Sequence, residues 1–223
     1  MKMVFSFQMK KMLKKVKMYR FVTMEKRPVI ISDKDLWIDF ISGENEAFQA
    51  IYEKYFPELF KYGCYFSDDE DLVKDCIQDL FVNLHNYRSK LKLTDKIRPY
   101  LIASFKQNIF KKLRSIAEGR KKLTSIESLS FDYSFVVEDT EENNDDDKIA
   151  LLQNAMNELT ARQREAIYLK YVTGLSYEEL SAAMNLSYQA SRNLISHAME
   201  RLRKVIADKA LILLSIIYKI RLH

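Results

Sequence analysis

The chain has 223 residues, and a hydrophobic content of 48% is enough to bury a core in one domain or in two small ones. With 4 Gly, 3 Pro and no convincing alternating strand pattern, the composition favours an all-α fold. A net charge of +5 suits a polyanionic partner without proving one. Cys64 and Cys76 are expected to be reduced core thiols, and the 3 histidines supply no metal-ligand spacing. We therefore expect no metal, no other cofactor and no enzymatic centre.

The chain is expected to divide into five segments. They are a basic N-terminal extension upstream of an alternative start (1–23), a first helical domain (24–117), a flexible linker that turns from basic to acidic (118–147), a second helical domain (148–206) and an apolar tail (207–223). The acidic half of the linker is either a solvated spacer or a mimic of phosphate in a basic groove. The tail is about half as long as a membrane span, and we expect it to pack within the chain rather than dock another protein.

Apolar residues at helical spacing predict four helices in the first domain. The first is capped by Ser32 or Asp33, and the second carries an aromatic stripe with a kink or break at Pro57. A run of acidic residues opens the third, where negative charge favours the positive end of the helix dipole. The fourth runs from about Arg98 to Ile116. We interpret the aromatic stripe as core rather than as a cofactor site.

The third helix has an outer face that its core stripe does not explain. The core stripe consists of Leu72, Val73, Cys76, Ile77, Leu80 and Leu84. Away from it lie Gln78, Phe81, Val82 and His85. An aromatic and a β-branched residue on a polar face indicate a protein–protein contact, because exposed apolar groups gather at binding surfaces. The alternative is that another helix of the same domain covers them.

The fourth helix combines aromatic and cationic residues on the side opposite its buried stripe. These residues are Tyr100, Gln107, Phe110, Lys111 and Arg114. Rings can stack on bases while Lys and Arg neutralise phosphates, a combination typical of single-stranded nucleic-acid binding. The alternative is an ordinary amphipathic helix that exposes a Tyr and a Phe.

Residues 160–204 predict a helix-turn-helix. Thr160, Ser176 and Ser187 each begin a helix, and Gln163 and Glu179 follow the first two at the spacing of a capping box. Only about three residues separate the second helix from the third. Such a tight turn would place the third helix in a major groove of DNA.

The third of these helices, from Tyr188 to about Ile206, has an apolar and a polar face. The residues expected in the core are Ala190, Leu194, Ala198, Leu202 and Val205. The polar residues are Gln189, Arg192, Asn193, Ser196 and Arg203. Amide, guanidinium and hydroxyl groups near the N-terminal end can address base edges, while Arg203 and Lys204 can meet phosphates. Caps, turn and basic residues agree, so we predict duplex DNA binding; a solvated face is the alternative.

Three stretches of the chain carry a resemblance to a known family. They are DLVKDCIQDLFVNLHNYR (71–88), IRPYLIASFKQNIFKKLR (97–114) and LTARQREAIYLKYVTGLSYEEL (159–180). In order and spacing they resemble bacterial RNA polymerase sigma factors of the sigma-70 family, extracytoplasmic-function (ECF) group, in a style common in Bacteroidetes. The first resembles the helix that binds core polymerase, with Gln78, Asp79 and Phe81 in its Q-[DE]-x-F pattern. The second resembles the helix that melts the minus-ten element, and the third begins the domain that reads the minus-thirty-five element.

The resemblance implies roles for three groups of residues. The polymerase-binding group is Asp75, Gln78, Asp79, Phe81, Val82 and His85. The minus-ten group is Tyr100, Lys106, Gln107, Phe110, Lys111 and Arg114. The minus-thirty-five group is Ser187, Tyr188, Gln189, Arg192, Asn193, Ser196, His197, Arg203 and Lys204. It also implies a cytoplasmic, non-enzymatic factor that binds core RNA polymerase and promoter DNA, does not insert into a membrane, and is held inactive by an anti-sigma partner, which is often membrane-anchored.

The chain also departs from the family pattern. Lys106-Gln107 replaces the usual Arg-Asn, and Leu194, His197 and Met199 stand where Arg or Lys is frequent. Fewer cations there would weaken phosphate binding and its salt dependence. Two other classes of function remain open at this point, a stand-alone helix-turn-helix regulator and an adaptor that binds only proteins.

Overall fold

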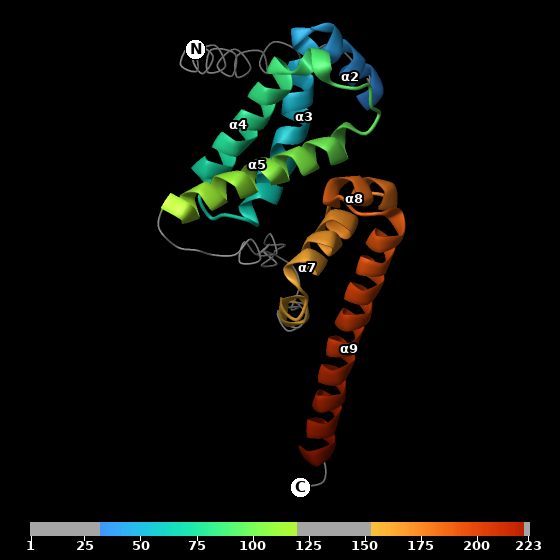
Figure 1. The fold of residues 1–223 in the computed structure, drawn as a ribbon. Coiled ribbons are helices and arrows are strands. Elements are labelled where there is room, and N and C mark those ends of the chain that lie inside the picture. Colours follow the sequence, from blue (N-terminus) through green and yellow to red (C-terminus); the bar gives the residue numbers. More distant parts are fainter. Residues whose placement is uncertain (1–31, 120–152, 221–223) are drawn as a thin grey trace, which may run out of the picture. The chain divides into compact units, whose positions relative to one another are not determined.

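In the parts that it describes, the structure, a computed structural model, is made of helices with turns and short loops between them (Figure 1). It describes residues 32–119 and 153–220, and of residues 119 and 208–220 only the helical backbone. These residues include no strand, which confirms the all-α prediction. The chain divides into Met1–Ser32 and Asp33–His223, and every helix described in this structure belongs to the second unit. The predicted extension 1–23 and most of the predicted linker lie outside the described residues, so the predicted domain boundaries stay a prediction.

Four α-helices form the N-terminal part of this unit. They are α2 (Asp33–Ser42), α3 (Asn45–Cys64), α4 (Glu70–Asn86) and α5 (Ile97–Gly119), with a short 3₁₀ turn, η1 (Arg88–Lys90), after α4. Successive helices pack on one another, and α3 also packs on α5. The helix α3 runs through Pro57, so of the predicted kink or break the break does not occur. The proline removes one backbone hydrogen bond, and the packed aromatic face of α3 holds the helix together.

The buried face of α4 includes Phe81, which corrects its predicted outward position. Phe81 has 0% of its surface exposed, and its ring centroid lies 4.9 Å from that of Tyr52 and 6.0 Å from that of Phe48. The complete buried set of α4 is Val73, Cys76, Ile77, Leu80, Phe81 and Leu84. These positions follow i, i+3, i+4 spacing, so Phe81 widens the apolar stripe by one position. The helix α3, which belongs to the same domain, covers Phe81, as in the alternative interpretation of this face.

A charged cluster joins the start of α2 to α3. The Asp33 carboxylate accepts hydrogen bonds from Lys54 Nζ, at 2.6 Å, and from the Tyr55 hydroxyl. Burial acts to raise the pKa of Asp33, but these two hydrogen bonds, together with the positive charges of Lys54 and Arg98, outweigh it, and the pKa lies below the ordinary aspartate value. The ionised carboxylate therefore stabilises the packing of α2 on α3.

The C-terminal part contains the predicted helix-turn-helix. Residues 153–157 are helical and are followed by α7 (Ala161–Ile167), the π-helical turn η3 (Tyr168–Val172), α8 (Tyr177–Met184) and α9 (Tyr188–Ile220). Thr160 and Ser176 form the two predicted capping boxes, and Ser187 Oγ accepts from the Ala190 N–H at 3.1 Å. All three predicted helix starts are confirmed. The helix α9 extends beyond the predicted end near residue 206, and the packing of the apolar tail lies outside the described side chains.

The packing of α9 on α8 differs by a small rotation from the prediction. The buried residues are Ser191, Ile195, Ala198 and Leu202, whereas Ala190, Leu194 and Val205 are only half-buried. The Ser191 and Ser181 hydroxyls are 2.9 Å apart, and Ser191 also donates to the Tyr188 carbonyl. These bonds offset the cost of burying a hydroxyl, which is why a polar residue can occupy the contact.

Candidate nucleic-acid interface

The polar face predicted for α9 is exposed in the structure. Exposed residues are Ser187, Tyr188, Gln189, Arg192, Asn193, Ser196, His197, Arg203 and Lys204, the whole predicted minus-thirty-five group. The turn before α9 is tight because Asn185 adopts a left-handed conformation, with φ 52° and ψ 54°, that Asn tolerates better than most residues. The turn and the buried contact with α8 therefore fix which side of α9 faces outward.

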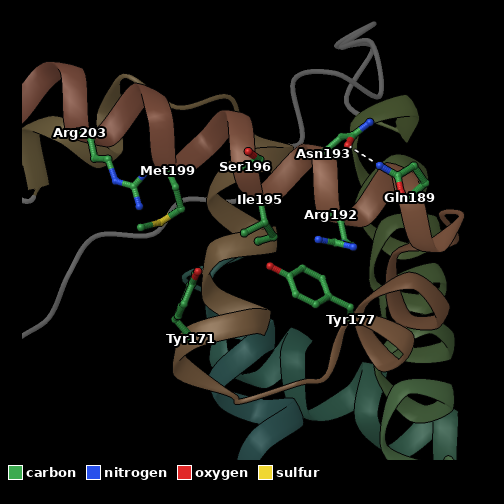
Figure 2. A pocket seen from close by; sticks show the side chains of 9 residues that line it. All are labelled: Tyr171, Tyr177, Gln189, Arg192, Asn193, Ile195, Ser196, Met199 and Arg203. Atoms are coloured by element: carbon green, nitrogen blue, oxygen red, sulfur yellow. Dashed lines mark hydrogen bonds between the residues drawn. The ribbon is translucent and has the colours of Figure 1, made fainter.

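Five of these residues line one open pocket of about 380 Å³ (Figure 2). They are Gln189, Arg192, Asn193, Ser196 and Arg203. Tyr171 and Tyr177, which are not among the predicted site residues, line the same pocket together with Ile195 and Met199. Tyr177 directly follows the cap residue Ser176 and is therefore the first residue of α8. The capping box in the sequence is the signal that could have indicated the position of Tyr177 beside the pocket.

Aromatic rings hold cations close to this pocket. Arg192 lies with its guanidinium carbon 5.9 Å from the ring centroid of Tyr188, within cation–π range. Lys170 Nζ lies 4.6 Å from the ring centroid of Tyr177 and donates to the Leu175 carbonyl. The rim thus carries positive charge beside flat rings, an arrangement suited to the phosphate and base edges of DNA.

His197 and Lys204 belong to a different side of α9. They line a second open pocket of about 530 Å³ with Glu158, Glu200 and Arg201. Arg201 and Glu158 are 3.7 Å apart there, an exposed ion pair. The structure therefore separates these two predicted residues from the group around Arg192, and the acidic neighbours make this side less suited to DNA.

The predicted minus-ten group lies on α5 with mixed exposure. Gln107, Lys111 and Arg114 are exposed, whereas Phe110 is half-buried against Phe66, with ring centroids 5.2 Å apart. Tyr100 is 37% exposed, and its ring makes a T-shaped contact with the buried Trp37, with ring centroids 5.7 Å apart. Gln107, Lys111 and Arg114 thus form a face with two cations, and in the described part of the chain this face is exposed to solvent.

The ammonium group of Lys106 forms an ion pair with a buried carboxylate. Its Nζ lies 2.7 Å from both carboxylate oxygens of Glu165, which has only 4% of its surface exposed. The Tyr62 hydroxyl donates to the same carboxylate at 2.6 Å. Burial first, and then the charge of Glu165, raises the pKa of the Tyr62 hydroxyl, so it stays protonated and donates. No sequence pattern indicates this cluster, because its members are far apart along the chain.

The predicted polymerase-binding group divides by exposure. Asp75 and Asp79 are exposed on α4, Gln78, Val82 and His85 are half-buried, and Phe81 is buried. The His85 ring lies 5.3 Å from that of Phe48, and burial, helped by Arg88, lowers its pKa. At neutral pH His85 is therefore uncharged, and the accessible surface of the group is acidic and amide in character.

Three further observations bear on chemistry and membranes. Among the described residues no group of three or more His, Cys, Asp or Glu is arranged to hold a metal ion. None of the helices in the described part of the chain has the length and apolar character to cross a bilayer. The thiol of Cys76 is buried, and burial raises its pKa to about 11, so it is protonated and unreactive.

Comparisons with known proteins identify the C-terminal part. The family described as Sigma-70, region 4 matches residues 149–202, which contain α7, α8 and the first part of α9. The chain is 24% identical over 158 residues to the ECF RNA polymerase sigma factor SigM of Bacillus subtilis (strain 168). That alignment covers 69% of this chain and 91% of SigM.

Two solved structures share the fold. CnrH, solved in complex with the cytosolic domain of CnrY, is 20% identical with a TM-score of 0.54, and 79% of this chain aligns with 97% of CnrH. The sigma factor RpoE, solved with the anti-sigma factor NepR from Bartonella quintana, is 20% identical with a TM-score of 0.53, covering 73% and 98%. Residues 149–202 thus match a Sigma-70 region 4 domain, and over 69% of its length the chain is similar to an ECF RNA polymerase sigma factor.

Proposed function

We propose that this chain is an alternative sigma factor that binds core RNA polymerase, recognises a promoter through two elements and helps to open the DNA. The observation that carries the proposal is the exposed polar face of α9, fixed by two capping boxes and a tight turn, within a Sigma-70 region 4 domain. Such a factor has no catalytic chemistry of its own, because the polymerase supplies it. It acts in the cytoplasm, where the polymerase is.

The three groups of residues have separate tasks in this proposal. The outer face of α4, with Asp75, Gln78 and Asp79, contacts the polymerase, and Phe81 supports that face from inside rather than touching the partner. The exposed cationic face of α5 meets the opened strand, where stacking and charge neutralisation offset the cost of unstacking. The N-terminal half of α9 enters the upstream major groove.

Lys106 must change partner for this function. It is bound to the buried Glu165 in the structure, and it can neutralise a phosphate only after leaving that carboxylate. We propose that promoter DNA replaces Glu165 as the partner of Lys106. An anti-sigma partner would act in the opposite direction by covering the α4 and α5 surfaces, and RpoE, which shares the fold, was solved with such a partner.

Co-purification with core polymerase and run-off transcription test the proposal. The expected results are a stable complex with core polymerase and transcripts with defined start points. A stand-alone regulator would instead bind a specific duplex without polymerase. An adaptor for proteins alone would give no transcript from any promoter, and either result would refute the proposal.

A further inference from the structure

We propose that Gln189 and Asn193 act as one unit that recognises an adenine in the promoter's upstream element. This inference rests on the proposed function, because it requires α9 to enter a major groove. It goes further by assigning a base to a particular pair of side chains. Both residues are exposed and lie one turn apart, in the first two turns of α9. That is the part of a recognition helix that reaches base edges.

A hydrogen bond links the two amides. Gln189 Nε2 donates to Asn193 Oδ1 at 3.0 Å, as Figure 2 shows by a dashed line at the rim of the pocket. The bond holds two flexible side chains in one arrangement before any DNA arrives. The conformational entropy of ordering them is therefore lost in the free protein and not again on binding.

The bond also determines which groups remain for a base. Asn193 Oδ1 is occupied, so Asn193 presents mainly the two donors of Nδ2, while Gln189 presents the acceptor Oε1. The pair thus offers one acceptor beside one donor. In the major groove adenine offers the complement, a donor at N6 beside an acceptor at N7.

The other bases match the pair less well. Guanine presents two acceptors, O6 and N7, so one of them would face the Gln189 carbonyl oxygen. Thymine presents one acceptor and a methyl group, and cytosine presents one donor, so each leaves part of the pair without a partner. An unpaired polar group in a desolvated interface is costly, and this sets the preference for adenine.

Arg192 provides an internal reference for the experiment. Its guanidinium lies beside the ring of Tyr188 and on the same pocket as the amide pair. Its fork of donors suits guanine rather than adenine. Loss of Arg192 should therefore change preference at a different base pair from the one that Gln189 and Asn193 recognise.

The test uses holoenzyme assembled from the full chain and core polymerase on promoters with a randomised upstream element. Sequencing of the transcripts gives the base preference at each position. The variants are Gln189→Ala, Asn193→Ala and Asn193→Asp. The last keeps an acceptor for Gln189 but removes the donor for N7. Asn154→Ala is the matched control, an exposed asparagine in the helical segment 153–157.

We expect the wild type to prefer adenine at one position by about 5- to 150-fold, the range for a bidentate base contact. All three variants should lose that preference at the same position. A fourth variant, which combines Gln189→Ala with Asn193→Ala, should lose no more than either single one, because the two side chains act together. The control and Arg192→Ala should keep the adenine preference.

Three results would overturn the inference. One is that the two alanine variants change different positions, another is that Asn193→Asp retains the adenine preference, and the third is an equal loss on all sequences, which indicates phosphate contacts. If wild-type holoenzyme gives no transcript from any promoter, the proposed function fails as well. The two failures are thus distinguishable.

Discussion

Replacing Phe81 by alanine tests whether this residue of the Q-[DE]-x-F pattern belongs to the core between α4 and α3. Phe81 is fully buried and packs on two aromatic rings of α3. Truncating a buried Phe to Ala costs about 3–5 kcal/mol of folding free energy, from lost apolar transfer and the cavity left behind. For a unit of this size each kcal/mol lowers Tm by about 2–4 °C, so the fall should be about 6–20 °C. Circular dichroism at rising temperature measures it.

A matched variant separates stability from binding. Asp79→Ala changes an exposed residue two positions earlier on the same helix, and its stability should change by less than about 0.5 kcal/mol. Asp79→Ala should nevertheless weaken the complex with core polymerase, measured by co-purification at a temperature where both variants are folded. If Phe81→Ala left Tm unchanged while abolishing polymerase binding, Phe81 would be a contact residue after all.

Other predictions concern the ion pairs and the DNA face. Lys106→Ala should destabilise the protein by about 3 kcal/mol in urea unfolding, because it leaves the Glu165 carboxylate buried without its cation. Adding Glu165→Gln should restore part of the lost stability. A double variant no more stable than Lys106→Ala alone would contradict this. Asp33→Asn should reduce stability at neutral pH. The pKa of Asp33 is lower in the native than in the unfolded state, so its contribution to stability is complete above the unfolded-state pKa and is lost as the pH falls through the native-state pKa. The stability difference between Asp33→Asn and wild type should therefore shrink in acid. A stability difference that grows in acid would refute the role of the hydrogen bond from Lys54. Arg203→Ala should lower the salt slope of promoter binding by about 1 on a log–log plot, with similar loss on all sequences, if it contacts a phosphate; an unchanged slope would remove that contact.

Helix starts in the C-terminal part could be predicted because their signals are local, whereas the end of α9 could not. Thr160, Ser176 and Ser187 each satisfy orphan backbone N–H groups within three residues, so the sequence alone contains both partners of each bond. The exposed polar face of α9 follows from the same helical pitch. For these features the tertiary structure adds little to the local pattern.

Burial could not be predicted so well, because it depends on partners far away in sequence. Whether Phe81 faces solvent or core is decided by the rings of α3, and helical periodicity permits both. The burial of Ser191 is not predictable from its own helix, because the cost is offset by Ser181, ten positions away on another helix. The contact of Lys106 with Glu165 spans 59 positions, and no local pattern announces it.

In vitro transcription with core polymerase, with and without the full chain, decides whether this protein directs the polymerase to promoters. Mapping of the transcript 5′ ends gives the start points in each case. We predict defined starts that require the chain and share an upstream element, and the loss of selectivity at part of that element in Arg192→Ala. Transcript ends that are the same with and without the chain would contradict a role in promoter selection.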